Sequence, residues 1–127
     1  MIDTDDNKFK LDHDLYLEND YYHIHQTIYF SISEDQVNTI EGTDSYQTIL
    51  KEQQENSNYV DDDNMMIKVE LGTLILRNLI LQGSENVIFI LKGASLEMYN
   101  CTVSSTADDK DSHGIILEEG ASLISKY

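Results

Sequence analysis

Residues 69–103, VELGTLILRNLILQGSENVIFILKGASLEMYNCTV, contain one pattern twice. The run GTLILRN begins at Gly72 and returns as GASLEMYN from Gly93. A shorter third copy, GASLIS, begins at Gly120. Self-similarity at a period of roughly 20 to 50 residues is typical of stacked repeats, in which each unit packs only on its neighbours.

The spacing of the copies predicts an all-β fold, a short parallel β-helix of about three to four coils. Leu74 aligns with Leu96 and then with Leu123, and the second interval is the longer one, which leaves room for a polar loop at 104–112. Each unit holds about three short strands separated by Gly and Asn corners. Such a unit buries its apolar face only by stacking, with equivalent strands about 4.8 Å apart.

The alignment of the copies assigns a structural ladder. Glycines recur at one corner, and Asn78 and Asn100 recur at the next, where Asn tolerates left-handed backbone. The alignment sets Ile67 and Val69 opposite Phe89 and Leu91, and then opposite Ile115 and Leu117. The ladder comprises Gly72, Leu74, Leu76, Asn78, Phe89, Leu91, Gly93, Leu96, Met98, Asn100, Cys101, Val103, Ile115, Leu117 and Leu123.

Residues 1–20 are charge-rich and are interpreted as a flexible or loosely packed segment ahead of a β-helix domain at 21–127. An alternative is a loosely held strand, since apolar residues fall on odd positions at Phe9, Leu11, Leu15 and Leu17. Residues 21–33, YYHIHQTIYFSIS, alternate with period two and predict one half-buried strand.

The middle of the chain is less regular. Gly42 lies in a turn between two short apolar pieces and can take a positive φ. Residues 52–64 form a polar loop that interrupts the repeat. Leucines at near-helical spacing in 71–81 allow a helix, but an initial Gly-Thr and an alternating partner segment favour strands.

The composition and net charge of the chain disfavour several classes of partner. The 127 residues make one domain, with a net charge of −16 from 8 basic and 24 acidic residues. That charge disfavours nucleic acid and anionic membrane surfaces as partners. The single Cys101 forms no intrachain disulfide. The acidic start lacks the features of a signal peptide, and no apolar run is long enough to cross a bilayer. We therefore expect a cytoplasmic protein without membrane insertion.

The runs TIEGTDSYQTIL (39–50), VELGTLILRNLIL (69–81) and LKGASLEMYNCTV (91–103) resemble the right-handed parallel β-helix, or pectin-lyase-like, superfamily. Within it the spacing looks most like the SHC SH2-domain-binding protein and Nessun Dorma group, whose coils similarly run from "TIEG" to "GxxxLxNCxL". The resemblance covers roughly residues 24–125. It implies a β-helix fold and a cytoplasmic scaffold linked to cytokinesis or signalling adaptors.

No convergent catalytic set is visible in the sequence. Acidic clusters at 61–63 and 108–111 contain the oxygen ligands that calcium prefers, but they lie in predicted loops and are interpreted as solvated. His23 and His25 share one face of a strand without a third zinc ligand. Arg77 and Glu97 occupy outward positions on neighbouring strands, where they could pair. We expect no cofactor and no enzymatic activity.

Tyrosines are concentrated in the N-terminal half, and Tyr21, Tyr22 and Tyr29 are the candidate binding residues, for a protein or a glycan. Ordinary half-buried packing is the alternative. The functional hypothesis is a non-enzymatic binding or scaffold module. The alternative is a fragment of a carbohydrate-active, lyase- or hydrolase-like, or adhesin β-helix. Since the third copy has no polar capping repeat, we expect the domain to be truncated there, or self-association or a partner to cover that edge.

Overall fold

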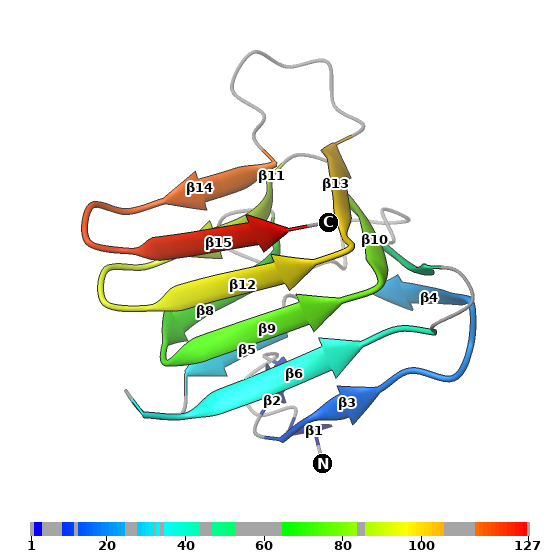
Figure 1. The fold of residues 1–127 in the computed structure, drawn as a ribbon, viewed down its shortest axis with the longest axis horizontal. Coiled ribbons are helices and arrows are strands. Elements are labelled where there is room, and N and C mark those ends of the chain that lie inside the picture. The colour runs from blue at the N-terminus through cyan, green and yellow to red at the C-terminus, as the bar shows by residue number, and fades with distance from the viewer. Residues whose placement is uncertain are drawn as a thin grey trace.

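The computed structural model describes residues 2–3, 9–11, 13–24, 28–31, 33, 35–43, 47–52, 65–83, 86–105 and 114–126 (Figure 1). Every regular element among these residues is a β-strand. The strands form three sheets, here called A, B and C, which receive successive strands of the chain in turn.

Sheet A has the order β1 (Ile2–Asp3), β2 (Phe9–Leu11), β5 (Ile28–Ser31), β8 (Met65–Leu71), β11 (Asn86–Ile90) and β14 (Ile115–Leu117). Sheet B has the order β3 (Leu15–Tyr16), β6 (Val37–Glu41), β9 (Thr73–Arg77), β12 (Ser95–Tyr99) and β15 (Ser122–Lys126). Sheet C has the order β4 (Tyr21–Ile24), β7 (Thr48–Glu52), β10 (Leu79–Gly83) and β13 (Thr102–Ser105).

The strand order confirms a short parallel β-helix. Each coil contributes one strand to sheets A, B and C, beginning with β2, β3 and β4 and continuing to β14 and β15. Neighbouring coils pair in parallel, and β1 joins β2 as an antiparallel strand at the N-terminal end. Figure 1 shows the strands of sheet B stacked from β3 to β15, with sheet A behind them.

The interior is filled by ladders of equivalent residues, as the repeat predicts. Leu96 pairs with Leu74 on one side and with Leu123 on the other. Met98 pairs with Leu76 on one side and with Ser125 on the other. Burial alternates strictly along the central strands, because successive side chains of a strand point to opposite faces. The helical alternative for residues 71–81 is therefore wrong: β8, β9 and β10 occupy this region.

One predicted register is wrong by a single position. The alignment turns Phe89 and Leu91 inward, whereas the structure pairs Ile88 and Ile90 with the inward residues of β8. Phe89 is half-buried on the outer side, where it lies opposite Lys68. A shift of one position exchanges the two faces of a strand, so this error moves a phenylalanine from the core to the surface.

The cause of the shift is an extra residue at a corner. Gly72 directly precedes β9, whereas Ala94 stands between Gly93 and β12. The interval from Ile67 to Ile88 in sheet A is therefore shorter by one position than the interval from Leu74 to Leu96 in sheet B. Applying the offset of sheet B to sheet A as well therefore aligns Ile67 with Phe89 in place of Ile88.

The corners themselves are as predicted. Gly72, Gly93 and Gly120 have φ values of 84°, 87° and 94°, and Asn78 and Asn100 have φ values of 57° and 56°. The Asn100 side-chain Nδ2 donates to Asn78 Oδ1 at 2.9 Å, which joins equivalent corners of neighbouring coils. These residues tolerate the left-handed backbone that the corners require.

Gly42 differs from its prediction, because it has no positive φ. The requirement is space: an added Cβ would lie 2.7 Å from Thr48 Oγ1 and closer still to the carbonyl oxygen of Asn78. The Gly42 amide donates to Arg77 O at 2.8 Å, so the backbones of two coils approach closely here. Glycine is therefore needed at this corner for close packing.

The N-terminal region departs from two expectations. β2 and β3 pair in parallel with β5 and β6, so the stack begins within residues 1–20 and ahead of the expected boundary at residue 21. The single strand predicted over 21–33 is two strands, β4 in sheet C and β5 in sheet A. The apolar residues of both strands point inward, so alternation alone does not reveal the change of sheet.

The inward residues at the C-terminal end of the described ladders are less buried than their neighbours. Leu117 continues the inward ladder of Ile90 and is 45% exposed. Val103, Ile115 and Leu123 are only partly buried, although their ladder neighbours in earlier coils are fully buried.

Candidate functional site

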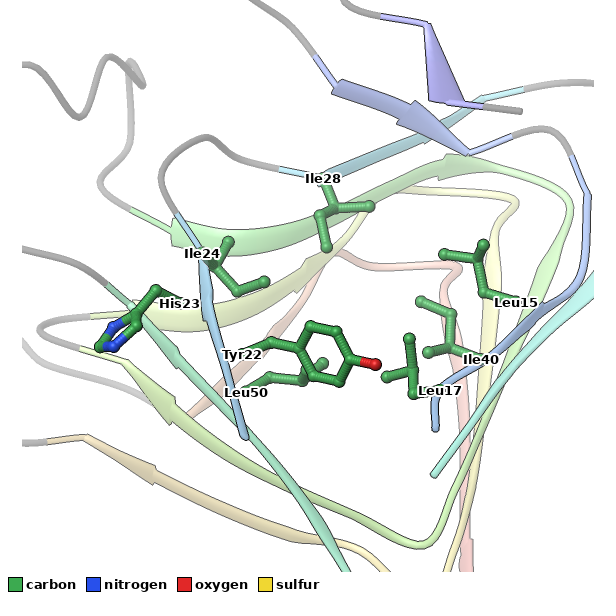
Figure 2. Close-up of a pocket in the computed structure, with 8 residues that line it drawn as sticks. All are labelled: Leu15, Leu17, Tyr22, His23, Ile24, Ile28, Ile40 and Leu50. Carbon is green, nitrogen blue, oxygen red and sulfur yellow. The ribbon is translucent and has the colours of Figure 1, made fainter. Parts of the chain in front are cut away.

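An apolar cavity of about 260 Å³ lies at the N-terminal end of the core. The inward ladders of the three sheets supply its walls, since Leu15 pairs with Ile40 and Tyr22 pairs with Leu50. The coils pack no further layer of described side chains on this side. The cavity is lined by Leu15, Leu17, Tyr22, His23, Ile24, Ile28, Ile40 and Leu50 (Figure 2).

Tyr22 places a polar group, its hydroxyl, at the solvent-exposed rim of this cavity. Its ring extends from β4 across the cavity, with the hydroxyl toward Leu17 (Figure 2). The hydroxyl oxygen accepts a hydrogen bond from the Asn19 backbone N–H at 3.1 Å. A hydroxyl that accepts one hydrogen bond keeps its own proton to donate. His23 is exposed and its imidazole points away from the cavity (Figure 2), with its ring centroid 5.0 Å from that of Tyr21.

A network of polar side chains lies next to the cavity, at the N-terminal end of the core. Asn38 is buried and heads the ladder of Leu74. Its Oδ1 accepts from Gln36 Nε2 at 2.8 Å, and its Nδ2 donates to Asp14 Oδ1 at 3.3 Å. The same carboxylate oxygen accepts from the Thr39 N–H at 2.8 Å. The polar groups of the buried Asn38 side chain therefore have hydrogen-bond partners, as buried polar groups generally do.

The outer face of sheet B carries a second arrangement, a column of side chains in register across its strands. We call it the sheet B column. Arg77 places its guanidinium carbon 4.5 Å from the ring centroid of Tyr99. The Tyr99 hydroxyl donates to Glu97 Oε1 at 2.7 Å, and this hydrogen bond, with burial as a lesser cause, raises the tyrosine pKa. The column consists of Tyr16, Glu41, Arg77, Tyr99 and Lys126.

This contact corrects the expected pairing of Arg77 with Glu97. The register sets Ile75 opposite Glu97 and sets Arg77 opposite Tyr99. Arg77 therefore stacks on an aromatic ring, while Glu97 is engaged by the hydroxyl of that same ring. Tyr16 at the end of the column is 66% exposed.

Charge is unevenly distributed between the described strands and the rest of the chain. These strands contain five of the 8 basic residues and five of the 24 acidic residues. They therefore carry no net charge, and the whole −16 belongs to the other residues. The sheet faces are near-neutral platforms on a strongly acidic protein.

The three tyrosines singled out in the sequence point to three different places. Tyr21 lies on the outer face of sheet C and is 42% exposed, whereas Tyr22 lines the cavity. Tyr29 lies in sheet A and is only 6% exposed. The Lys68 ammonium lies 5.9 Å from the Tyr29 ring centroid and 5.8 Å from that of Phe89. These tyrosines do not form one site.

The remaining candidate groups give no metal cluster in the part of the chain that the structure describes. His25 and the acidic clusters at 61–63 and 108–111 lie outside the described residues. Cys101 is half-buried against the core, with its Sγ 3.4 Å from Leu76 O. Burial raises the pKa of this thiol. The geometry fits a small core residue.

The sequence contains one indication of the cavity, but the hydrophobic pattern alone does not show its meaning. Apolar alternation at residues 9–17 suggests a strand, but only the coil order shows that Leu15 and Leu17 begin a ladder. The sheet B column cannot be recognised in the sequence, because Tyr16 and Tyr99 are far apart along the chain. Only the register of the stacked strands puts them on the same face of sheet B.

Among the residues that the structure describes, no helix is long and apolar enough to cross a membrane. Comparison with protein-family models, with curated proteins and with solved structures finds no match.

Proposed function

We propose that this chain is a non-catalytic β-helix module that binds a protein partner on the outer face of sheet B. The sheet B column is the observation that carries the proposal. Tyrosine and arginine are enriched among the residues that dominate binding energy at protein interfaces. Here Arg77 is held against Tyr99, and Tyr99 is held by Glu97, so these groups lose little freedom on binding.

The partner surface is a neutral or basic one with an apolar anchor. Ile124 is 45% exposed on this face next to the column, and Val37, at the other end of β6, is 53% exposed on the same face, so both offer apolar contacts. The sheet face itself carries balanced charges, with Glu41 and Glu97 against Arg77 and Lys126. The net charge of −16 repels acidic surfaces and accelerates the approach of basic ones.

A cytoplasmic scaffold linked to cell division or signalling adaptors is the proposed setting. The support is the resemblance of the coils, especially YNCTV at 99–103, to the SHC SH2-domain-binding protein and Nessun Dorma group. A scaffold role also suits a surface of rigid stacked strands, because rigid platforms hold partners in fixed geometry.

Site-specific photo-cross-linking tests the docking face. A benzophenone amino acid replaces Ile75 on sheet B or, as the matched control, Ile80 on sheet C; both are half-buried outward residues on consecutive strands. Cells expressing the Ile75 variant should give one dominant protein adduct that the Ile80 variant does not give. Equal adducts from both positions would place the interface elsewhere.

The purified cross-linked partner then tests the column. Arg77→Ala should weaken its binding at least tenfold, the effect expected of a residue central to an interface. Lys51→Ala, an exposed cation on sheet C, should leave binding unchanged. Association should slow as salt is raised, since added ions screen the net charge of −16. Equal loss in the two variants would contradict recognition by the column.

The carbohydrate alternative is tested on the same protein. Incubation with polyuronate and galactan libraries should yield no cleavage products, and cleavage would refute the non-catalytic proposal. Binding of an oligosaccharide that is lost in Tyr16→Ala would assign the exposed ring to a glycan instead of a protein partner.

A further inference from the structure

We infer that the cavity at the N-terminal end of the core binds a small neutral ligand: an aliphatic or aromatic group of moderate size with one hydrogen-bond acceptor. This site is independent of the protein partner proposed for sheet B. The lining comes from β3, β4, β5, β6 and β7 and from the connection at Leu17, so the packed ladders fix its shape.

The size of the ligand follows from the size of the cavity. A buried apolar cavity of about 150 Å³ holds benzene. On that scale the 260 Å³ cavity accommodates roughly ten carbon atoms. The walls are built of leucine and isoleucine side chains together with the Tyr22 ring, so burial of hydrocarbon drives binding.

The polar part of the ligand follows from Tyr22. Its hydroxyl oxygen already accepts from the Asn19 N–H, and its proton is available to an acceptor on the ligand. An alcohol, ether or carbonyl oxygen placed at the hydroxyl would complete its hydrogen bonding. Specificity for such an oxygen over plain hydrocarbon is therefore modest and depends on one residue.

Charge excludes an anionic ligand such as a fatty acid carboxylate. Among the described residues, the cavity lining contains no arginine or lysine to neutralise a carboxylate, and the imidazole of His23 points away from the cavity (Figure 2). The connection that leads from Leu17 to β4 contains the exposed residues Glu18 and Asp20. A carboxylate entering here would lose water and meet like charges, both of which oppose binding.

Displacement of 1-aminonaphthalene, a neutral fluorophore whose ten carbon atoms match the size of the cavity, tests the proposal on the full chain. The fluorophore should bind with stoichiometry one, and 1-octanol should displace it. Octanoate should be at least tenfold weaker than 1-octanol, because it presents the excluded charge. Octanoate that binds as tightly as 1-octanol would overturn the assignment of a neutral ligand.

Two variants locate the binding. Leu17→Trp fills the cavity and should abolish fluorophore binding, whereas Leu123→Trp, at the opposite end of the core, should preserve it. Tyr22→Phe keeps the walls and should weaken 1-octanol about fivefold while leaving the fluorophore unaffected. Tyr22→Phe keeps the test decisive if Leu17→Trp does not fold. Unchanged 1-octanol affinity in Tyr22→Phe would refute the role of the hydroxyl.

The competing occupant of the cavity is a second copy of the chain. Sedimentation velocity should show a monomer whose size does not change with protein concentration or with 1-octanol. Concentration-dependent association that disappears in Leu17→Trp and is competed by 1-octanol would overturn the ligand proposal in favour of end-to-end contact.

Discussion

Leu96→Ala and Leu123→Ala make the same chemical change in one ladder, but the free energy of unfolding that they remove should differ severalfold. Leu96 is fully buried between Leu74 and Leu123, whereas Leu123 is partly exposed in the last coil. The change removes three carbon atoms, at roughly 0.8 kcal/mol for each buried one. With the cavity left between closed coils, Leu96→Ala should lose about 3–4 kcal/mol.

Leu123→Ala should lose about 1 kcal/mol, because part of its side chain is already in contact with water and a partly exposed position leaves no enclosed cavity. Urea unfolding followed by far-ultraviolet circular dichroism measures both values, and an unchanged m value would show that the same cooperative unit unfolds. Equal losses at the two positions would refute the difference in burial between Leu96 and Leu123.

Three further changes test other features. Asn100→Ala removes the hydrogen bond to Asn78 and puts alanine into left-handed backbone, so it should cost about 2 kcal/mol in thermal unfolding, while Asn100→Gly should cost less. Gly42→Ala should cost about 2 kcal/mol in the same assay, the middle of the range for overpacking, because its Cβ meets Thr48 Oγ1 at 2.7 Å; a neutral result would contradict the close approach. Cys101 has a raised pKa, so less thiolate is present at pH 8 and iodoacetamide should label the native protein more slowly than the urea-unfolded chain. Because the pKa of the Cys101 thiol is higher in the folded protein than in the unfolded chain, its contribution to stability is present below the unfolded-state pKa. This contribution is lost as the pH rises through the folded-state pKa.

The repeat predicts the fold because stacking requires like residues at like positions. Gly72, Gly93 and Gly120 recur where the backbone is left-handed, and the Leu74–Leu96–Leu123 ladder is in register. The error at Phe89 shows the limit of this reasoning. An extra residue at a corner changes the face of a whole strand, yet the hydrophobic pattern of residues 87–91 fits either face.

The candidate sites are harder to predict, because they depend on contacts between coils that are far apart in sequence. Tyr22 is one of two adjacent tyrosines with the same local pattern, and only the phase of β4 puts it in the cavity and Tyr21 outside. The cavity exists where ladders begin, and the start of a ladder has no local sequence signature. The sequence therefore identifies candidate aromatic residues by type but not by the face on which they lie.

Stacking also explains where the acidic residues lie. An outward position of a parallel β-helix recurs about every 4.8 Å, so an acid repeated in every coil would create a column of like charges. Each adjacent pair in water would cost roughly 1 kcal/mol. The sheet B column avoids this cost, since Arg77 follows Glu41 and the uncharged Tyr99 separates Arg77 from Lys126. The described strands contain equal numbers of acidic and basic residues, so they stack closely without the repulsion that a net charge of −16 spread evenly along the chain would cause.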